Sequence, residues 1–194
     1  MKLLLLILII LTISLYLIYT NIYDDDNLIL VQSTLDNSSY WVRDINNKSE
    51  AANTLAAIKI NMIKLINHLN KNIETFPNYY NYIKDLVKRT KIIYIYETPK
   101  DDKYTSYTIN KGEKIVFCLR SKIFEKIHDM NTLMYVVIHE MAHVGCPEYG
   151  HTPLFKKIFK FLLKEAINIQ IYKPVDYRIN PQKYCGMIIN EYIL

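Results

Sequence analysis

Cysteine is scarce in this chain of 194 residues, and no two of its three cysteines form a C-x-x-C pair. Cysteine zinc sites use such closely spaced pairs, so the sequence argues against one. We interpret Cys118, Cys146 and Cys185 as three small buried residues, with Cys146–Cys185 as the pair to test if one disulfide forms. Alternatively, Cys146 is a ligand that keeps a nearby metal site latent.

Features of nucleic-acid-binding proteins are also missing. No zinc ribbon, basic tail or platform of aromatic and basic residues is visible, and the formal net charge of +5 is modest for this length. Lys156, Lys160 and Lys164 recur along one helical face, a pattern typical of a solvated surface. We therefore expect no nucleic acid among the partners.

One short motif, H-E-x-x-H at residues 139–143, contains most of the candidate metal-binding and catalytic residues. Residues four apart share one face of a helix, so His139 and His143 can present two imidazoles to a single metal ion. Glu140 lies beside them, close enough to hold a water on that metal, which is the chemistry of zinc peptidases. The flanks are apolar enough for a buried helix, and a buried histidine pair needs a partner such as a metal.

A third histidine follows where this helix must end. The glycines and the proline within residues 145–150 cannot comfortably continue a helix, so the chain should turn back on itself. His151 then precedes Thr152 and Pro153, which suit the N-cap and the first position of a new helix. Seven residues separate His143 from His151, so the metzincin pattern H-E-x-x-H-x-x-G-x-x-H is not met.

Other ionisable residues are also candidates for metal ligands. Glu165 on the following helix is a rival third ligand, and Glu148 in the loop is a weaker one. The lysines around Glu165 favour a surface charge instead, and His151 is better placed. His68 and His128 stand outside the motif, and we expect them to be surface or helix-end histidines.

The motif and its context resemble those of the compact zincins of the SprT/WLM and YgjP-like group. That signature is H-E-x-x-H, a short loop, and Gly-His or Asn-His followed three or four residues later by Phe. The matching residues here are His139, Glu140, His143, Gly150, His151 and Phe155. The resemblance covers residues 92–168 and includes a hairpin with strands over 106–110 and 114–120.

The resemblance implies a zinc site with assigned roles. Glu140 would act as the general base, and the strand before the motif helix would pair with an extended protein or peptide substrate. The zinc ligands would be His139, His143 and His151. Candidates for an additional electrophile near the metal are Tyr149, Tyr177 and Tyr184, although most tyrosines in so tyrosine-rich a chain are expected to serve packing.

The N-terminus predicts a membrane anchor. Residues 3–19 are apolar apart from Thr12 and Ser14. At about 1.5 Å per residue they span about 25 Å, and extension through Tyr23 closes the gap to a bilayer core of about 30 Å. A cleaved signal peptide is the alternative, but no Ala-x-Ala-like cleavage site follows, since the first alanine is Ala51. The charges flanking the segment favour a single-pass membrane protein whose catalytic domain is lumenal or external.

Apolar periodicity predicts an α+β fold for the remainder. A helix from Ser49 to about Asn72, a shorter helix after Pro77 and a buried strand over 91–97 precede the hairpin, and the motif helix, another helix and a tail follow. We expect a compact single-domain zincin whose small mixed or antiparallel sheet packs on the active-site helix. The predicted division is 1–23 membrane anchor, 24–48 linker or arm, and 49–194 metallopeptidase-like domain.

The hypothesis from the sequence is a membrane-anchored, zinc-dependent metallopeptidase that hydrolyses peptide bonds. One alternative is an anchored interaction protein that keeps a zincin fold without turnover, although the intact Glu140 argues against it. The other is a secreted, soluble metallopeptidase released by cleavage near residue 20. Zn²⁺ is the expected cofactor, and the expected partners are a protein or peptide substrate and, through the N-terminal helix, a membrane.

Overall fold

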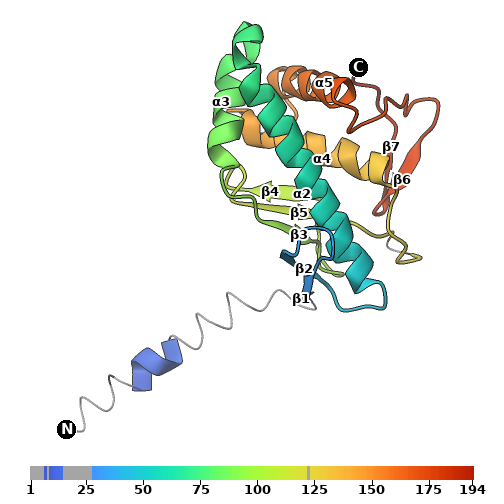
Figure 1. Ribbon diagram of the computed structural model, residues 1–194. Helices are drawn as coiled ribbons and strands as arrows, with labels where there is room; N and C mark the ends of the chain where they lie inside the picture. The colour runs from blue at the N-terminus through green and yellow to red at the C-terminus, as the bar shows by residue number, and fades with distance from the viewer. Residues whose placement is uncertain (1–6, 8, 15–27, 122) are drawn as a thin grey trace.

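The computed structural model describes residues 7, 9–14, 28–121 and 123–194 (Figure 1). From residue 28 onward, helices and strands are mixed in an α+β order, as predicted. The elements are β1 (Leu28–Gln32), β2 (Ser39–Arg43), α2 (Lys48–Lys71), the 3-10 turns η1 (Ile73–Thr75) and η2 (Pro77–Tyr79), α3 (Tyr80–Arg89), β3 (Ile95–Glu97), β4 (Tyr107–Ile109), β5 (Lys114–Phe117), α4 (Met130–Gly145), α5 (Pro153–Asn168), β6 (Gln182–Tyr184) and β7 (Met187–Ile189).

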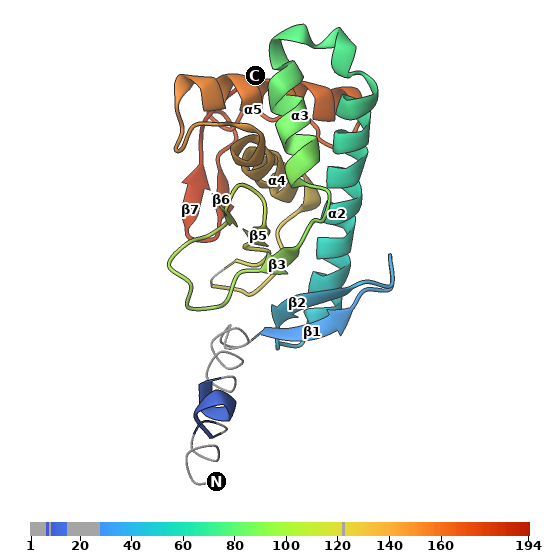
Figure 2. The same cartoon turned by 90° about the vertical axis from the view of Figure 1, so that its left-hand side faces the viewer.

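Helix α4 lies at the centre of the helical part, with α2, α3 and α5 packed around it (Figure 2). Its N-cap is Asp129, whose carboxylate accepts a hydrogen bond from the backbone N–H of Thr132 at 3.0 Å. Nearly every α4 side chain is buried, and Val137, Ile138 and Met141 are wholly inaccessible to solvent. Each such side chain contributes about 1.5–3 kcal/mol of burial free energy, so α4 is held firmly in place.

A three-stranded sheet in the order β3-β5-β4 lies below α3, α4 and α5 in the view of Figure 1, beside the lower part of α2. β3 runs parallel to β5, with Ile95 opposite Ile115, whereas β4 and β5 form the predicted antiparallel hairpin. β5 is central, and its Ile115, Val116 and Phe117 are all buried, as expected for a strand covered on both faces. β4 is an edge strand, and its position beside α4 brings that edge to the histidine motif.

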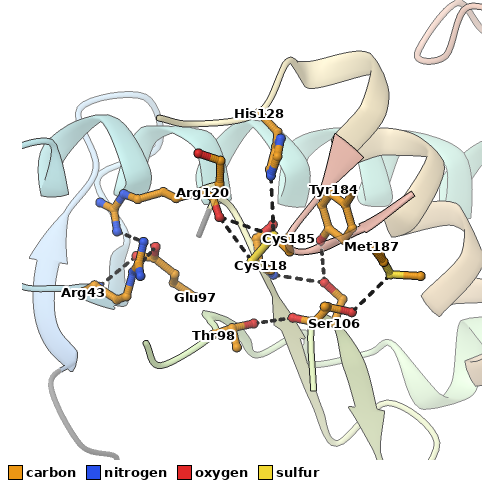
Figure 3. Close-up of a disulfide and its surroundings, with 12 residues drawn as sticks. Arg43, Glu97, Thr98, Ser106, Cys118, Arg120, His128, Tyr184, Cys185 and Met187 are labelled. Atoms are coloured by element: carbon orange, nitrogen blue, oxygen red, sulfur yellow. Dashed lines mark hydrogen bonds and ion pairs between the residues drawn. A yellow bond between two sulfur atoms is a disulfide. The ribbon is translucent and has the colours of Figure 1, made fainter. Parts of the chain in front are cut away.

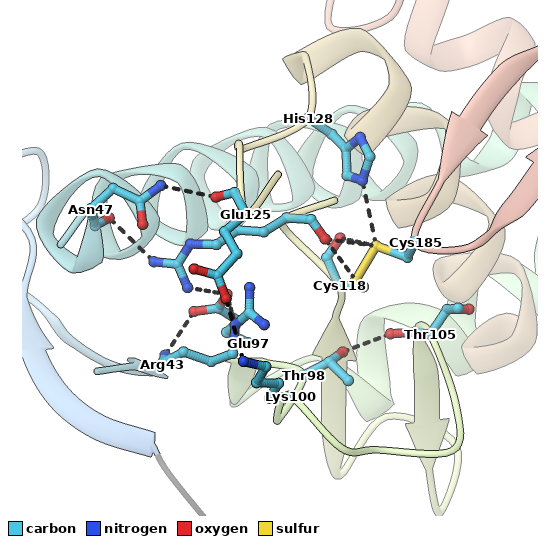
Figure 4. Close-up of polar contacts among 11 residues, drawn as sticks. Arg43, Asn47, Glu97, Thr98, Lys100, Thr105, Cys118, Glu125, His128 and Cys185 are labelled. Carbon is cyan, nitrogen blue, oxygen red and sulfur yellow. Dashed lines mark hydrogen bonds and ion pairs between the residues drawn. A yellow bond between two sulfur atoms is a disulfide. The ribbon is translucent and has the colours of Figure 1, made fainter. Parts of the chain in front are cut away.

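The segment predicted to be a linker or arm, residues 24–48, is described from residue 28 onward. This described part contains the antiparallel hairpin β1–β2, which packs against α2. A buried ion cluster joins this hairpin to the sheet: Arg43 Nε donates to Glu97 Oε1 at 3.1 Å, and Arg120 pairs with the same carboxylate (Figure 3). Arg120 Nη2 also donates to the backbone oxygen of Asn47 at 3.2 Å. Asn47 lies at the start of α2 (Figure 4). Residues 28–48 are thus packed against the rest of the domain.

The predicted N-terminal transmembrane helix is not supported. Within the part of the chain that the structure describes, no helix combines the length and the apolar character needed to cross a lipid bilayer. This finding contradicts both the anchor in the predicted fold and the predicted single-pass membrane localisation. Most of the expected anchor, residues 1–23, lies outside the described residues, which there comprise only 7 and 9–14.

The C-terminal tail forms a further hairpin, β6–β7, which a disulfide links to the sheet (Figure 3). The bond joins Cys118, directly after β5, to Cys185 in the β6–β7 turn, whereas Cys146 is a free and buried thiol. The expected pair Cys146–Cys185 is therefore wrong, whereas all three cysteines are buried, as expected. Spacing in the sequence could not identify the partner, because tertiary packing alone brings the end of β5 to a turn 67 residues away.

Candidate metal centre

The motif helix presents two histidines on one face. His139 and His143 lie one turn apart on α4, and their Nε2 atoms are 3.2 Å from each other. The ring of Phe155 stacks on that of His143 with 4.2 Å between centroids, and Phe159 meets the edge of His139 at 5.2 Å. This apolar packing fixes the orientation of both imidazoles.

The loop after α4 brings the third histidine to the other two. The helix ends at Gly145, and Gly150 takes a left-handed φ of +78°, which glycine adopts without strain. Thr152 then caps α5 by accepting a hydrogen bond from the backbone N–H of Phe155 at 3.2 Å. His151 Nε2 consequently lies 3.0 Å from His139 Nε2 and 3.2 Å from His143 Nε2, and this trio could hold a metal ion.

A lysine that the sequence analysis missed secures this loop. Lys111, in the β4–β5 turn, donates from Nζ to the backbone oxygens of Cys146 at 2.8 Å and Glu148 at 2.7 Å. The adjacent Gly112 packs so closely on α4 that a Cβ there would meet Val144 Cγ1 at 3.0 Å. The predicted turn Lys111-Gly112-Glu113 was visible in the sequence, but its contact with the loop before His151 depends on the fold.

Burial sets the protonation of the site. Burial, and then the neighbouring histidines, lowers the pKa of His139 to about 3. Burial, followed by His151 and Lys111, lowers the pKa of His143 to about 4. Both imidazoles are therefore neutral at pH 7. Burial acts in the opposite direction on Glu140, whose side chain is almost inaccessible, and raises the pKa of that carboxyl group to about 8.

These groups open onto a cavity of about 650 Å³. One side is the edge strand β4 with the residues before it. Helix α4 contributes His139, Glu140 and His143, and the loop before α5 contributes His151. The β6–β7 hairpin and the residues that follow it form the remaining wall. A cavity of this size is typical of a ligand site, and here it joins a potential metal to an edge strand.

The rival ligands lie elsewhere. Glu165 Oε2 lies 2.8 Å from His68 Nε2, at the far end of α5 from His151, so this glutamate is neither a ligand nor a purely solvated charge. Glu148 is exposed in the loop, and Cys146 is buried outside the histidine trio. The expected surface or helix-end position fits His68, in the last turn of α2.

His128 and the three candidate tyrosines differ in their surroundings. His128 is partly buried beside the disulfide, with Nε2 at 3.5 Å from Cys185 Sγ. Tyr149 is exposed at the cavity mouth, where Lys111 Nζ lies 4.3 Å from the centre of its ring. Tyr184 lines the cavity, and its hydroxyl lies 2.6 Å from Ser106 Oγ, whereas Tyr177 is buried against Tyr135 outside it.

Comparison with known proteins gives one extensive match. No family model matches the chain. This chain is 47% identical over 164 residues to uncharacterized protein R325 of Acanthamoeba polyphaga mimivirus. The match covers 84% of this chain and 83% of that protein. Uncharacterized protein 042R of Invertebrate iridescent virus 3 is 47% identical over 83 residues, which cover 42% of this chain and 50% of that protein.

Among solved structures, Wss1 from Saccharomyces cerevisiae is similar with a TM-score of 0.37 and 21% identity, over 48% of this chain and 80% of that one. A TM-score this low does not establish a shared fold. The viral match, in contrast, extends over most of both chains at nearly half identity. This chain therefore belongs to the same family as uncharacterized protein R325 of Acanthamoeba polyphaga mimivirus.

Proposed function

We propose that this protein is a zinc-dependent peptidase in which His139, His143 and His151 hold the metal and Glu140 is the general base. The observation that carries the proposal is the convergence of three imidazole nitrogens beside a buried carboxyl group on one cavity. Structural zinc sites use four protein ligands, whereas three ligands leave a position open, as hydrolysis requires.

The donor set fits zinc. Atoms bound at about 2.0–2.1 Å to a tetrahedral zinc ion lie about 3.3 Å apart, close to the separations of 3.0–3.2 Å between the Nε2 atoms. Metal ligands must be deprotonated, and the low pKa values of His139 and His143 meet that requirement at neutral pH. When bound, zinc supplies a Lewis acid that lowers the pKa of water and stabilises negative charge on a carbonyl oxygen.

Glu140 would move the proton. Its carboxylate accepts a proton from the attacking water and returns it to the amine that leaves when the peptide bond breaks. Burial raises the pKa of the group to about 8, and a neighbouring dication lowers it again, because an opposite charge favours the carboxylate. These opposing influences suit a carboxyl group that must both take up and release a proton near neutral pH.

The cavity is shaped for an extended chain. β4 forms one edge of the sheet, and its Tyr107 and Thr108 line the cavity beside the histidine trio. Edge strands commonly pair with added peptide segments, which would place a substrate carbonyl next to Glu140. A protein or peptide in extended form is therefore the substrate class that this site favours.

The test compares full-length wild type with Glu140→Gln and with the control Glu148→Gln, an identical change at an exposed residue of the adjoining loop. Each protein is assayed for bound zinc and for cleavage of a peptide library. We expect one zinc ion in all three, and cleavage by Glu140→Gln to fall by about 10²–10⁴-fold while Glu148→Gln cleaves normally. Retained cleavage by Glu140→Gln would disprove the role of the base, and a zinc-loaded wild type that cleaves nothing would disprove the peptidase.

A further inference from the structure

We propose that the β6–β7 hairpin is the substrate-binding wall of this cavity, that Met187 and Ile188 receive an apolar side chain there, and that the Cys118–Cys185 disulfide holds the wall in position. The inference rests on the proposed function only in treating the ligand of the cavity as a peptide substrate. It adds the class of side chain that is preferred and the covalent bond on which this preference depends.

The hairpin contributes apolar side chains to the cavity. Four of its residues line the cavity: Tyr184, Met187, Ile188 and Ile189. Tyr184 and Ile189 are buried, whereas Met187 and Ile188 remain 49% and 57% exposed. Large apolar side chains grouped at a concave surface mark a binding site more often than isolated ones do. An incoming apolar side chain would remove this surface from water, which favours binding in proportion to the area that is buried.

The β6–β7 wall adjoins the strand along which the substrate would lie. Thr105, just before β4, has its Oγ1 at 3.7 Å from Met187 Sδ, so the start of β7 adjoins the start of the β4 segment. Alternate side chains of an extended peptide point to opposite sides. A peptide along β4 would therefore direct every second side chain toward the surface formed by Met187 and Ile188.

The hairpin needs a tether to keep this position. It is a separate sheet of two strands, and such hairpins are marginally stable by themselves. Cys185 and Gly186 form its turn with φ values of +48° and +88°, so the disulfide fixes the hairpin at its tip. Figure 3 shows the second attachment: Ser106 Oγ lies 2.6 Å from Tyr184 OH and accepts a hydrogen bond from the backbone N–H of Cys118 at 3.0 Å.

The first experiment maps the ligand directly and does not require catalysis. An alanine-rich nonapeptide with one central photo-leucine is irradiated with zinc-loaded Glu140→Gln protein, and the cross-linked residues are identified by mass spectrometry. We expect cross-links at Met187 and Ile188, with competition by the equivalent leucine peptide but not by an aspartate peptide. Cross-links confined to other residues, or an equal effect of the aspartate peptide, would overturn the proposal.

The second experiment measures the dissociation constant of a fluorescent version of the leucine peptide in the same Glu140→Gln background. Ile188→Ser should weaken binding about tenfold, because most of the burial on that side chain is lost. Ile123→Ser is the matched control, since Ile123 is 81% exposed and lies outside the cavity lining. Equal affinities for the two variants, or no measurable binding of the leucine peptide to the parent protein, would contradict the proposal.

The third experiment removes the tether without a reducing agent, since thiol reagents also bind zinc. We expect Cys118→Ser/Cys185→Ser to retain zinc and to bind the leucine peptide about tenfold more weakly. Hydrogen exchange should accelerate over 182–189 and not in α4. Unchanged affinity, or uniform loss of protection together with loss of zinc, would show that the disulfide does not act on the wall. All three experiments measure binding of the peptide and do not require catalysis. Their outcomes can therefore be interpreted even if the protein hydrolyses no peptide.

Discussion

Two parts of the cavity are held in contrasting ways. The three histidines lie within 13 consecutive residues, 139–151, and their positions follow from a helix, its end and the cap of the next helix. The β6–β7 wall depends on a bond between residues 67 positions apart and on the contact between Tyr184 and Ser106. The comparison teaches that the reactive groups are set by local chain geometry, whereas the surface that would select a substrate is set by tertiary contacts.

The largest expected effect is on the local part of the site. His151→Ala removes one of three ligands, so zinc binding should fall below detection at micromolar protein and peptide cleavage should be lost. The change lies outside the buried core, and the circular dichroism spectrum should therefore remain that of the wild type. Zinc content measured by mass spectrometry checks this, with His68→Ala as a control that should keep the metal. Full zinc occupancy in His151→Ala would contradict the assignment.

The non-local part should affect stability more than chemistry. Cys118→Ser/Cys185→Ser opens a loop closed across 67 residues, which lowers the free energy of unfolding by about 2–4 kcal/mol. Urea denaturation of the zinc-loaded proteins measures the loss. Cys146→Ala, which removes a buried thiol without a covalent bond, should cost only about 1 kcal/mol. Equal losses for the two changes would remove the distinction between the tethered wall and the rest of the core.

Substitution of Lys111 tests whether the metal site also depends on a tertiary contact. As a positioning residue, it holds the backbone of the loop that carries His151, so Lys111→Met should weaken zinc binding about 10–100-fold, as is usual for groups that orient metal ligands. Competition with a chromogenic chelator measures the affinity. Lys160→Met makes the same change on α5, outside the histidine trio, and should leave the affinity unaltered. If the two variants bind zinc alike, the loop needs no such support.

The most gradual expected effect is that of pH on the metal-free protein. His139 and His143 have folded-state pKa values of about 3 and about 4, below the value of about 6.5 for an unfolded histidine. Below pH 6.5 the unfolded chain binds two protons, at these histidines, that the folded chain excludes. Folded Glu140, whose pKa is raised to about 8, holds one proton that the unfolded chain loses, so the net result is a fall in stability toward pH 4. The melting temperature measured with excess chelator should show this decline. His139→Gln/His143→Gln should show a shallower decline, and a parallel one would exclude these histidines as its cause.

The same contrast explains how far the sequence could predict the structure. The H-E-x-x-H spacing, the glycines near 145–150 and Thr152-Pro153 each act over a few residues, and together they placed His151 beside the other two histidines. The long helix α2 and the β4–β5 hairpin were also predictable, from apolar periodicity and turn residues. The N-terminal hairpin was missed because its polar residues resemble a linker, while Val42 and the buried Arg43–Glu97 pair secure it.

Neither the cysteine pairing nor the contact of Lys111 with the loop before His151 could be predicted from the sequence, and the physical reason is the same. A cysteine or a lysine carries no information about a partner that the fold brings near from dozens of residues away. The membrane anchor was predicted from an apolar run, its flanking charges and the lack of a cleavage site, and the described residues contain no helix able to span a bilayer.

The most direct test of the central claim is the location of zinc in crystals of the zinc-loaded protein, from anomalous diffraction at the zinc absorption edge. The account predicts one strong peak about 2.0–2.2 Å from the Nε2 atoms of His139, His143 and His151, on the side open to the cavity. A peak between His68 and Glu165 instead, or no peak at the histidine trio, would contradict it.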